Sequence, residues 1–255
     1  MEERPVVLEV KKLCKFFGGI KAVNNVDMKL YKGEIIAIVG DNGAGKSTLI
    51  KTISGIYHKD SGDIYINGNK VEIHDPNDAR NCGIETVYQE ESIVPSFNAS
   101  LNLFLGRQKY RKNILGKWFK FVDFKFMRKE TQKLLKRIGI ELKNIDAELT
   151  NLSGGQRQSV VVGRAVYWGG KIIILDEPTN NLGVKQERNI MALIEKIRNE
   201  YDVSIIIISH NMSHVFEIVD RIVVLRNGFK VGERIKDKTT PTEVVSLITG
   251  AVKAD

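Results

Sequence analysis

The sequence predicts an α/β protein with a mostly parallel β-sheet, an N-terminal antiparallel β subdomain and an inserted α-helical subdomain. The first observation is a series of short apolar runs, which are typical of buried strands: EIIAIVG, GIETVYQ, KIIILDE, VSIIIIS and RIVVLRNG. The second is that helical patterns separate several of these runs. Strands that alternate with amphipathic helices favour a parallel sheet covered on both faces.

The N-terminal part of the chain predicts antiparallel strands. Short strand-like runs and turns fill residues 6–34, and the segment GDIYINGNKVEI places Asn67-Gly68 between two β-rich runs. An Asn-Gly pair in this position is a strong signal for a two-residue hairpin turn. We therefore expect a small antiparallel sheet here, apart from the parallel one.

Helical periodicity appears in two segments. In KQERNIMALIEKIRNEY, apolar residues follow the i, i+3, i+4, i+7 spacing of one helix face, at Ile190, Leu193, Ile194 and Ile197. The segment FMRKETQKLLKRIGI predicts a second helix that ends at Gly139. It lies in a middle region with few strand signals. The sequence thus predicts one domain, residues 1–255, with residues 92–167 as the helical subdomain and residues 1–91 and 168–255 as the α/β core with its antiparallel part.

Composition limits the cellular setting. The 255 residues are 42% hydrophobic and 27% charged, with a net charge of +8, which suits nucleotides, nucleic acid or an anionic membrane surface. Cys14 and Cys82 lie far apart without a CxxC motif, so a reduced, cytosolic chain is expected. The acidic start lacks the apolar region of a signal peptide. No apolar run approaches the roughly 18 residues of a membrane span, so any membrane role would be peripheral.

A phosphate-binding loop is the strongest motif. GDNGAGKS matches the G-x-x-x-x-G-K-[ST] pattern between a predicted strand and a predicted helix. Backbone N–H groups of such a loop surround phosphate oxygens, Lys46 reaches the β- and γ-phosphates, and the Ser47 hydroxyl binds Mg²⁺. This context predicts the core of a P-loop NTPase. The expected nucleotide contacts are Gly40, Asp41, Asn42, Gly43, Ala44, Gly45, Lys46, Ser47 and Thr48.

A second helix start resembles an anion site. In LSGGQRQ, Ser153 and Gln156 have capping-box spacing ahead of an apolar helix, and Gly154 and Gly155 leave the first N–H groups of that helix uncovered. Taken alone, the segment is better explained as an ordinary helix start.

With both motifs in one chain, the sequence resembles the ATP-binding subunits of ABC transporters. GDNGAGKST resembles Walker A, VYQEE the Q-loop, LSGGQRQ the signature, IIILDEP Walker B, TNNLG the D-loop and IISHN the switch-histidine loop, in the order of the family. The resemblance implies two ATP molecules sandwiched in a head-to-tail dimer. Ser153, Gly154, Gly155 and Gln156 of one subunit would then cover the γ-phosphate held by the P-loop of the other.

The resemblance also implies roles for four side chains. Asp176 would hold Mg²⁺ through water, and Glu177 would be the general base. His210 would contact the γ-phosphate and hold the attacking water. Gln89 would lie near Mg²⁺ and that water, and would join the core to the helical subdomain. The strand that carries both acids is expected beside the P-loop strand, so that both acids reach the γ-phosphate.

Three further features leave alternatives open. Phe17 would match the aromatic residue that stacks on adenine, although Phe16 competes for that role. His210 and His214 have the spacing of a metal pair but no evident third ligand, so no zinc site is expected. The basic, aromatic stretch 107–126 is expected to be a solvated face with its aromatics packed inward. A contact with a membrane subunit is the main alternative, followed by nucleic-acid stacking.

Several stretches resemble monosaccharide importers of the ribose, xylose and fructose type. They are VYQEESIVPSFNASLNLFLGR, DEPTNNLGVKQ and VVSLITGA. Leu101 stands where these importers usually have Glu, and Asn180-Asn181 replaces a pair of small residues. Most ABC ATPases have Asp at the position of Gly183, whereas the monosaccharide importers have Gly there, as this chain does. Many relatives fuse two ATPase modules, whereas this chain has one and should form a homodimer or pair with another ATPase subunit.

The sequence therefore predicts an ATPase that uses ATP and Mg²⁺ to drive monosaccharide uptake through membrane permease subunits. It would act as a peripheral protein on the cytoplasmic face of the membrane. The sugar would bind to other subunits, and no nucleic acid is expected. Two alternatives remain: a soluble ABC-type ATPase that acts on nucleic acid or ribosomes, and the ATPase of an exporter.

Overall fold

The computed structural model describes residues 4–88, 93–111 and 120–251. The chain divides into two compact units, and each is described by itself. Unit 1 comprises Met1–Val87, Gly170–Pro178 and Ile197–Asp255, and unit 2 comprises Tyr88–Gly169 and Thr179–Lys196. The segment Thr179–Lys196 groups with the helical residues, although the sequence-based boundaries assign it to the core.

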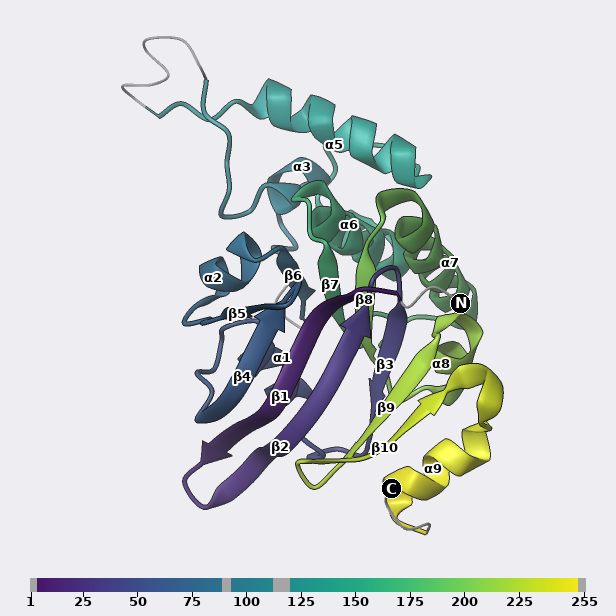
Figure 1. Ribbon diagram of the computed structural model, residues 1–255. Helices are drawn as coiled ribbons and strands as arrows, with labels where there is room; N and C mark the ends of the chain where they lie inside the picture. Colours follow the sequence, from purple (N-terminus) through teal and green to yellow (C-terminus); the bar gives the residue numbers. More distant parts are fainter. Residues whose placement is uncertain (1–3, 89–92, 112–119, 252–255) are drawn as a thin grey trace. The chain divides into compact units, whose positions relative to one another are not determined.

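Unit 1 contains the expected antiparallel sheet, with strand order β2-β1-β4-β5 (Figure 1). The strands are β1 (Val6–Phe17), β2 (Ile20–Tyr31), β4 (Ser61–Ile66) and β5 (Asn69–Val71). Asn67 and Gly68 join β4 to β5 with φ angles of 49° and 79°. Positive φ at both central residues is the type I′ geometry of tight hairpins, so the predicted turn is confirmed.

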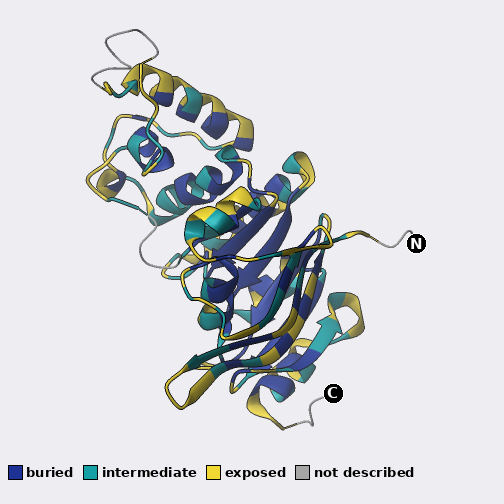
Figure 2. Cartoon of the chain, turned by 60° about the vertical axis from the view of Figure 1, so that its left-hand side comes forward, coloured by how far each residue is buried: buried dark blue, intermediate teal, exposed yellow. Residues whose placement is uncertain are grey.

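The second sheet of unit 1 has the order β10-β9-β3-β8-β7-β6. Its strands are β3 (Ile35–Val39), β6 (Ile84–Val87), β7 (Ile172–Asp176), β8 (Ser204–Ile208), β9 (Arg221–Arg226) and β10 (Phe229–Ile235). All neighbours pair in parallel except β10 with β9. Every residue of β3, β7 and β8 is buried, as expected for apolar strands covered on both faces (Figure 2). The predicted α/β class is confirmed.

One expectation about this sheet is wrong. The strand that carries Asp176 does not lie beside the P-loop strand, because β8 lies between β3 and β7. Apolar runs alone do not reveal strand order, since all of these strands are equally hydrophobic. The consequence concerns function: the end of β8, and His210 after it, lies next to the end of β7.

A helix links the two sheets of unit 1. α1 (Lys46–Ile53) contributes Leu49, Ile50 and Ile53 to a hydrophobic core that also contains side chains from both sheets. The other helices of this unit are α2 (Pro76–Asn81), α8 (Met212–Ile218), α9 (Pro241–Thr249) and a 3₁₀ turn at Lys236–Lys238. The last residues of α7 (Val184–Tyr201), from Ile197 on, also belong here.

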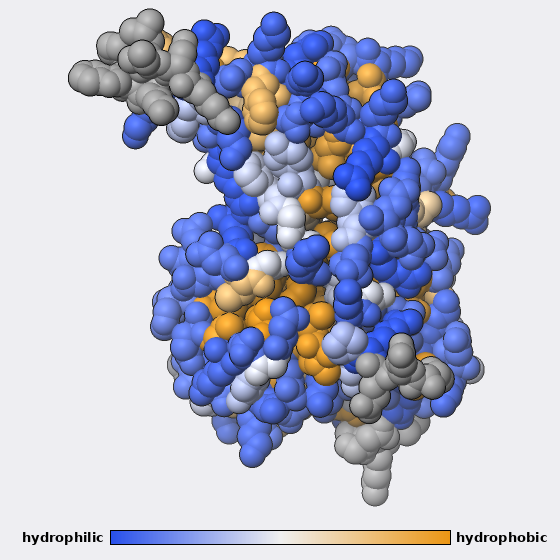
Figure 3. All heavy atoms as spheres, turned by 45° about the horizontal axis from the view of Figure 1, so that its top comes forward, coloured by the Kyte–Doolittle hydropathy of each residue, from blue (hydrophilic) through white to orange (hydrophobic). Residues whose placement is uncertain are grey.

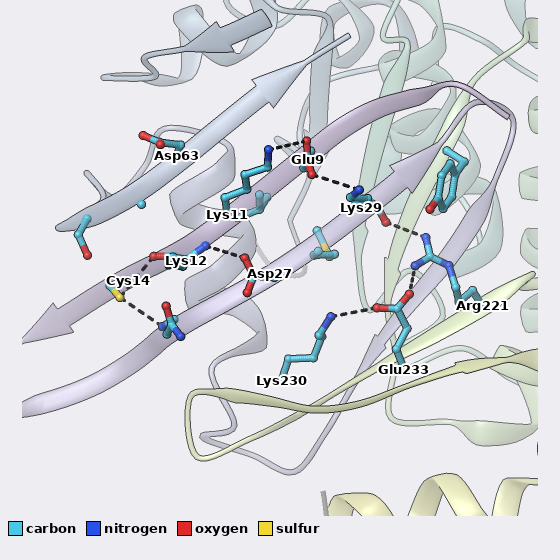
Figure 4. A pocket seen from close by; sticks show the side chains of 16 residues that line it. Glu9, Lys11, Lys12, Cys14, Asp27, Lys29, Asp63, Arg221, Lys230 and Glu233 are labelled. Carbon is cyan, nitrogen blue, oxygen red and sulfur yellow. Dashed lines mark hydrogen bonds and ion pairs between the residues drawn. The ribbon is translucent and has the colours of Figure 1, made fainter. Parts of the chain in front are cut away.

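A buried arginine also joins the two sheets. Arg221 of β9 forms a bidentate pair with Glu34, with Nε–Oε1 and Nη2–Oε2 distances of 2.8 Å. It donates to the Lys29 carbonyl of β2 at 2.7 Å (Figure 4). It also pairs with Glu233 of β10. Burial raises the pKa of the Glu233 carboxyl, but the charges of Arg221 and Lys230 outweigh burial and hold that pKa below its usual value.

Next to this network lies a cavity of about 810 Å³ on the four-stranded sheet (Figure 4). Three of the lysines that line it have carboxylate partners: Lys11 and Lys29 lie 3.4 Å and 3.3 Å from Glu9, and Lys230 lies 3.1 Å from Glu233. Because these charges are already paired, we interpret the cavity as part of the structural join between the sheets.

Unit 2 is helical. It contains α3 (Ala99–Leu103), α5 (Phe124–Ile138), α6 (Gly154–Tyr167), a 3₁₀ turn at Leu149–Asn151 and the start of α7. Gly139 ends α5 with a φ of 79°, which confirms the predicted stop. Phe104 is fully buried at the centre, with its ring centroid 5.0 Å from that of Tyr167 and 5.6 Å from that of Trp168.

The basic, aromatic stretch 107–126 belongs to unit 2, and its residues 112–119 lie outside the described part. The expectation that its aromatics pack inward is wrong for the described residues, since Tyr110, Phe121, Phe124 and Phe126 are all exposed. Of these, Phe126 still meets the buried Phe104 edge to face, with 6.5 Å between ring centroids. Arg107 and Lys109 lie over the Trp168 ring, at 4.7 Å and 5.1 Å from its centroid.

Hydrophilic side chains cover most of the face drawn in Figure 3, with hydrophobic side chains gathered in patches. Among the described residues, no helix combines the length and apolar character that a membrane crossing needs.

Candidate nucleotide site

The P-loop is a turn between β3 and α1 in unit 1, and two of its glycines have no alternative. Gly40 has a φ of 154°, and a Cβ there would lie 2.2 Å from the Leu225 carbonyl oxygen. Gly45 has a φ of 101°, and a Cβ there would lie 2.2 Å from the Ala22 carbonyl oxygen. Both positions therefore require glycine for conformation and for space. Gly43 has a φ of 79° but open space around it.

The N-terminus of α1 can receive an anion. No side chain caps this helix, and its first turn contains no acidic residue. Lys46, Ser47 and Thr48 form that turn, so their N–H groups lie where a helix has no internal acceptors. Asp41 and Asn42 are exposed, whereas Ala44 is buried in the core. Free N–H groups and the helix dipole together make this turn suited to phosphate.

The Lys46 amine is buried at the P-loop. Its Nζ donates to the carbonyl oxygens of Gly40 at 2.6 Å and Asp41 at 2.9 Å. Burial lowers the pKa of this amine below its ordinary value, although the charges of Glu177, Asp176 and Asp41 act in the opposite direction. Lys46 thus lies within electrostatic reach of both acids. A phosphate beside it would supply a negative partner that the two carbonyls only partly replace.

The environment of the Asp176 carboxylate suits a bound cation. Asp176 ends β7 and is 5% exposed, and its Oδ1 is buried without a hydrogen-bond partner. Burial and then the charge of Glu177 raise the pKa of this carboxyl to about 6, although Lys51 and Lys46 act to lower it. A buried polar atom without a partner is costly, and a hydrated cation would satisfy it.

The residues around Asp176 fit magnesium better than a metal held by protein alone. Over the described residues, no group of three or more His, Cys, Asp or Glu side chains could hold a metal ion. Mg²⁺ in nucleotide sites is commonly bound by one or two protein groups, by water and by the substrate phosphates. Asp176 and the Ser47 hydroxyl provide two oxygen donors of this kind.

Glu177 and His210 lie together. Glu177 directly follows β7, where its N–H donates to the carbonyl of Ile208 at the end of β8 at 3.0 Å. Its φ of 49° is unusual for a residue with a side chain. Its Oε1 lies 3.3 Å from Nδ1 of His210, and the His210 side chain is 64% exposed. The neighbouring strand ends thus bring together a carboxylate and an imidazole that are 33 positions apart.

Phe17 lies at the end of β1 and is 42% exposed, whereas Phe16 is only partly exposed. The Phe17 ring meets Tyr57 edge to face, with 5.1 Å between centroids, and Lys15 Nζ lies 5.4 Å from the Phe17 centroid. A flat exposed ring of this kind can stack on a base. Sequence reasoning missed Tyr57; its only signal was an aromatic residue shortly after the P-loop helix.

The signature motif lies in unit 2, where α6 starts. The Ser153 hydroxyl accepts from the Gln156 N–H at 3.3 Å, and the Gln156 side chain accepts from the Ser153 N–H at 3.1 Å. The predicted capping box is therefore present. Gly154 and Gly155 form the first two positions of the helix. Gln89, the remaining candidate from the sequence, lies outside the described residues.

Comparisons with known proteins identify the family of this chain. Residues 23–180 match the family model described as ABC transporter. The chain is 42% identical to the fructose import ATP-binding protein of Rhizobium meliloti, over 98% of this chain and 96% of that protein. It is 41% identical to a xylose/arabinose import ATP-binding protein of Sulfolobus acidocaldarius, over 95% of this chain and 94% of that protein.

Longer relatives and solved structures also match. The chain is 38% identical to a ribose import ATP-binding protein of Caldanaerobacter subterraneus, of which it covers 48%. A nucleotide-free ATP-binding cassette from an ABC transporter superimposes with a TM-score of 0.81 at 25% identity, over 95% of this chain and 98% of that one. A dimeric bacterial ABC transporter cassette gives 0.74 at 26% identity, over 90% and 98%. The chain belongs to the ATP-binding subunits of ABC transporters, which are ATPases.

Proposed function

We propose that this chain hydrolyses ATP in a head-to-tail dimer and so drives monosaccharide uptake through membrane permease subunits. The ATPase chemistry is supported by the contact between Glu177 and His210, with 3.3 Å between Oε1 and Nδ1. Glu177 directly follows Asp176, and both acids lie within electrostatic reach of Lys46. The monosaccharide assignment is supported by the relatives, whose names specify fructose, xylose/arabinose and ribose import.

In this proposal, the loop Gly40–Thr48 binds the triphosphate through backbone N–H groups, and Lys46 pairs with its β- and γ-oxygens. The Phe17 ring stacks on adenine. Ser47 and Asp176 would hold Mg²⁺, Asp176 through water, and the family resemblance implies that Gln89 would be a further neighbour of that site. The bound Mg²⁺ would neutralise charge on the β- and γ-phosphate oxygens.

Glu177 acts as the general base. Its carboxylate accepts a proton from a water molecule as the water oxygen attacks phosphorus in line, and the β–γ bridging oxygen leaves with ADP. His210 holds the water and the γ-phosphate in that line. The Glu177 backbone suits this task, because its hydrogen bond to Ile208 ties the carboxylate to the strand that leads to His210.

The dimer completes each site. Ser153, Gly154, Gly155 and Gln156 of one chain would cover the γ-phosphate on the P-loop of its partner, with the N-terminus of α6 directed at the phosphate. The partner is a second copy or another ATPase subunit, since this chain matches single-module relatives over nearly their full length. The assembly would sit peripherally on the cytoplasmic face of the membrane, where permease subunits receive the motion and other subunits bind the sugar.

The base assignment is tested with Glu177→Gln. This substitution keeps the shape of the side chain but removes its basicity, so hydrolysis should fall at least about 100-fold while ATP binding persists. Steady-state phosphate release and equilibrium binding of ATP measure the two effects. Glu72→Gln removes an exposed carboxylate of unit 1 and serves as the control, with hydrolysis within about twofold of wild type. Hydrolysis at the wild-type rate by Glu177→Gln would exclude this base.

The importer assignment needs the membrane partners. In vesicles that contain a sugar permease and carry a sugar-binding protein outside, ATP hydrolysis by this chain should rise when fructose, ribose or xylose is supplied. Failure of the chain to associate with such a permease would contradict the importer. Salt-sensitive stimulation of the ATPase by DNA or RNA would instead favour an enzyme that acts on nucleic acid.

A further inference from the structure

The backbone does not explain the two glycines of the signature motif. Gly154 and Gly155 open α6 with φ angles outside the positive range, so residues with a side chain could adopt the same conformation. The family resemblance attributes the open space at this helix end to a nucleotide from a second subunit. The structure shows that side chains of the same chain already occupy part of that space.

Two side chains of unit 2 lie against these glycines. A Cβ on Gly154 would lie 2.9 Å from Cδ2 of Leu182, closer than such atoms approach in proteins, and 3.6 Å from Oε1 of Gln186. A Cβ on Gly155 would lie 3.3 Å and 3.4 Å from Cβ and Cγ of Gln186. A side chain at Gly154 would therefore require Leu182 to shift, and one at Gly155 would require Gln186 to give by a few tenths of an ångström, without any second subunit.

Leu182 and Gln186 are held by one local structure, the D-loop turn and the start of α7. The Leu182 N–H donates to the Thr179 carbonyl at 3.3 Å, and the Gln186 N–H donates to the Gly183 carbonyl at 2.8 Å. Both side chains are partly buried. The turn and the helix start therefore move together, and contact with Gly154 and Gly155 passes their position to the first turn of α6.

We propose that Leu182 is a positioning residue for the signature motif, with Gln186 as a second contact. Its packing on Gly154 makes the D-loop and the signature helix of one chain a single rigid piece, which aims the first N–H groups of α6. The inference rests on the proposed function, in which those N–H groups face the γ-phosphate held by the partner. A small shift of such donors is expensive, since misplacement by 1 Å can cost about 100-fold in rate.

A double-substitution cycle tests this role. Gly154→Ala adds the methyl group that meets Leu182, and should lower kcat at least about tenfold while MgATP binding to the single chain stays within about twofold. Leu182→Ala removes Cδ2, the atom that this methyl group would contact. In the Leu182→Ala background, Gly154→Ala should lower kcat less than about threefold. If the loss stayed tenfold in both backgrounds, packing against Leu182 would not be the reason for the glycine, and the proposal would fail.

Gly163→Ala is the matched control on the same helix. A Cβ there would lie 3.0 Å from Cδ1 of Ile138 and 3.4 Å from Cδ2 of Leu134, on the face of α6 toward α5. Its effect on kcat should be the same in the wild-type and Leu182→Ala backgrounds, because the two sites share no contact. Relief of the Gly163→Ala effect by Leu182→Ala would mean that the second substitution merely loosens unit 2, and would overturn the specific role of Leu182.

Two readouts separate this inference from the proposed function. The packing itself is measured as coupling between Gly154→Ala and Leu182→Ala in the unfolding temperature, which needs no ATP. A wild-type chain without ATPase activity would contradict the proposed function and the positioning role together. An active wild type with coupling in the unfolding temperature but none in kcat would overturn the positioning role alone.

Discussion

Single residues of the P-loop show how conformation and space act separately. Gly40 combines a positive φ with a carbonyl oxygen 2.2 Å from the place of a Cβ, whereas Gly43 has a positive φ in open space. The motif pattern fixes Gly40 and Gly45 but leaves the position of Gly43 free. The motif therefore predicts that Gly40 is required and that Gly43 is not. The structure adds the reason: a side chain at Gly40 would meet both a conformational penalty and a clash, whereas one at Gly43 would meet only the conformational penalty.

The two glycines should respond differently to alanine. Gly40→Ala forces a clash with backbone and should reduce the free energy of unfolding by about 3 kcal/mol or more. Gly43→Ala meets only the conformational penalty, about 1–2 kcal/mol. Urea denaturation of the two variants measures the difference. Equal losses would show that the Leu225 carbonyl moves away at little cost.

At the scale of the element, Gly183 occupies a position that the family resemblance marks as unusual. It directly precedes α7, its carbonyl accepts from the N–H groups of Gln186 and Glu187, its φ is not positive, and a Cβ there would meet nothing within 4 Å. Glycine is therefore not needed for the shape of this turn. It leaves the start of α7 without a capping side chain at that position.

Gly183→Asp should consequently stabilise the chain. A carboxylate at the N-cap accepts from the first N–H groups and favours the helix dipole, for a gain of about 0.3–1 kcal/mol. Gly183→Ala is the control, because it adds a side chain without an acceptor and should destabilise by roughly 0.5 kcal/mol. Thermal or urea unfolding distinguishes the two signs. A loss of stability with Asp would mean that the turn does not tolerate a side chain.

Elements were predictable where their signals are local. The Asn67-Gly68 hairpin, the end of α5 at Gly139 and the capping box of Ser153 each depend on residues within one turn. The position of β8 between β3 and β7 depends on contacts between distant segments, and all three strands have the same apolar character. For the same reason no pattern indicated that Leu182 packs on Gly154, or that Tyr57 meets Phe17.

At the scale of the whole molecule, Arg221 provides the polar join within unit 1. It reaches Glu34, Glu233 and the Lys29 carbonyl, and thereby connects strands of both sheets. Glu34 is 5% exposed and its carboxylate also accepts from the Tyr31 N–H, so removal of Arg221 would leave a buried carboxylate without its cationic partner. No sequence pattern indicates the pair of Arg221 and Glu34, whose members are 187 positions apart.

Arg221→Met should therefore lower the free energy of unfolding by about 3–5 kcal/mol. Arg128→Met is the matched control, since Arg128 also forms a close pair, with Asp146 at 2.9 Å, but both side chains are about half exposed. An exposed pair contributes less than about 1 kcal/mol. Chemical denaturation of both variants at neutral pH compares the two. Similar small losses would show that water reaches Glu34 readily.

The left-handed conformation of Glu177 places the proposed function and the stability of the chain in opposition. A non-glycine residue with a φ of 49° costs about 1–2 kcal/mol relative to an ordinary conformation. Glycine at this position would relieve that cost but would also remove the carboxylate on which hydrolysis depends. Selection for stability alone would favour glycine, whereas selection for turnover retains glutamate. The cost is borne by every folded molecule, whether or not it meets ATP.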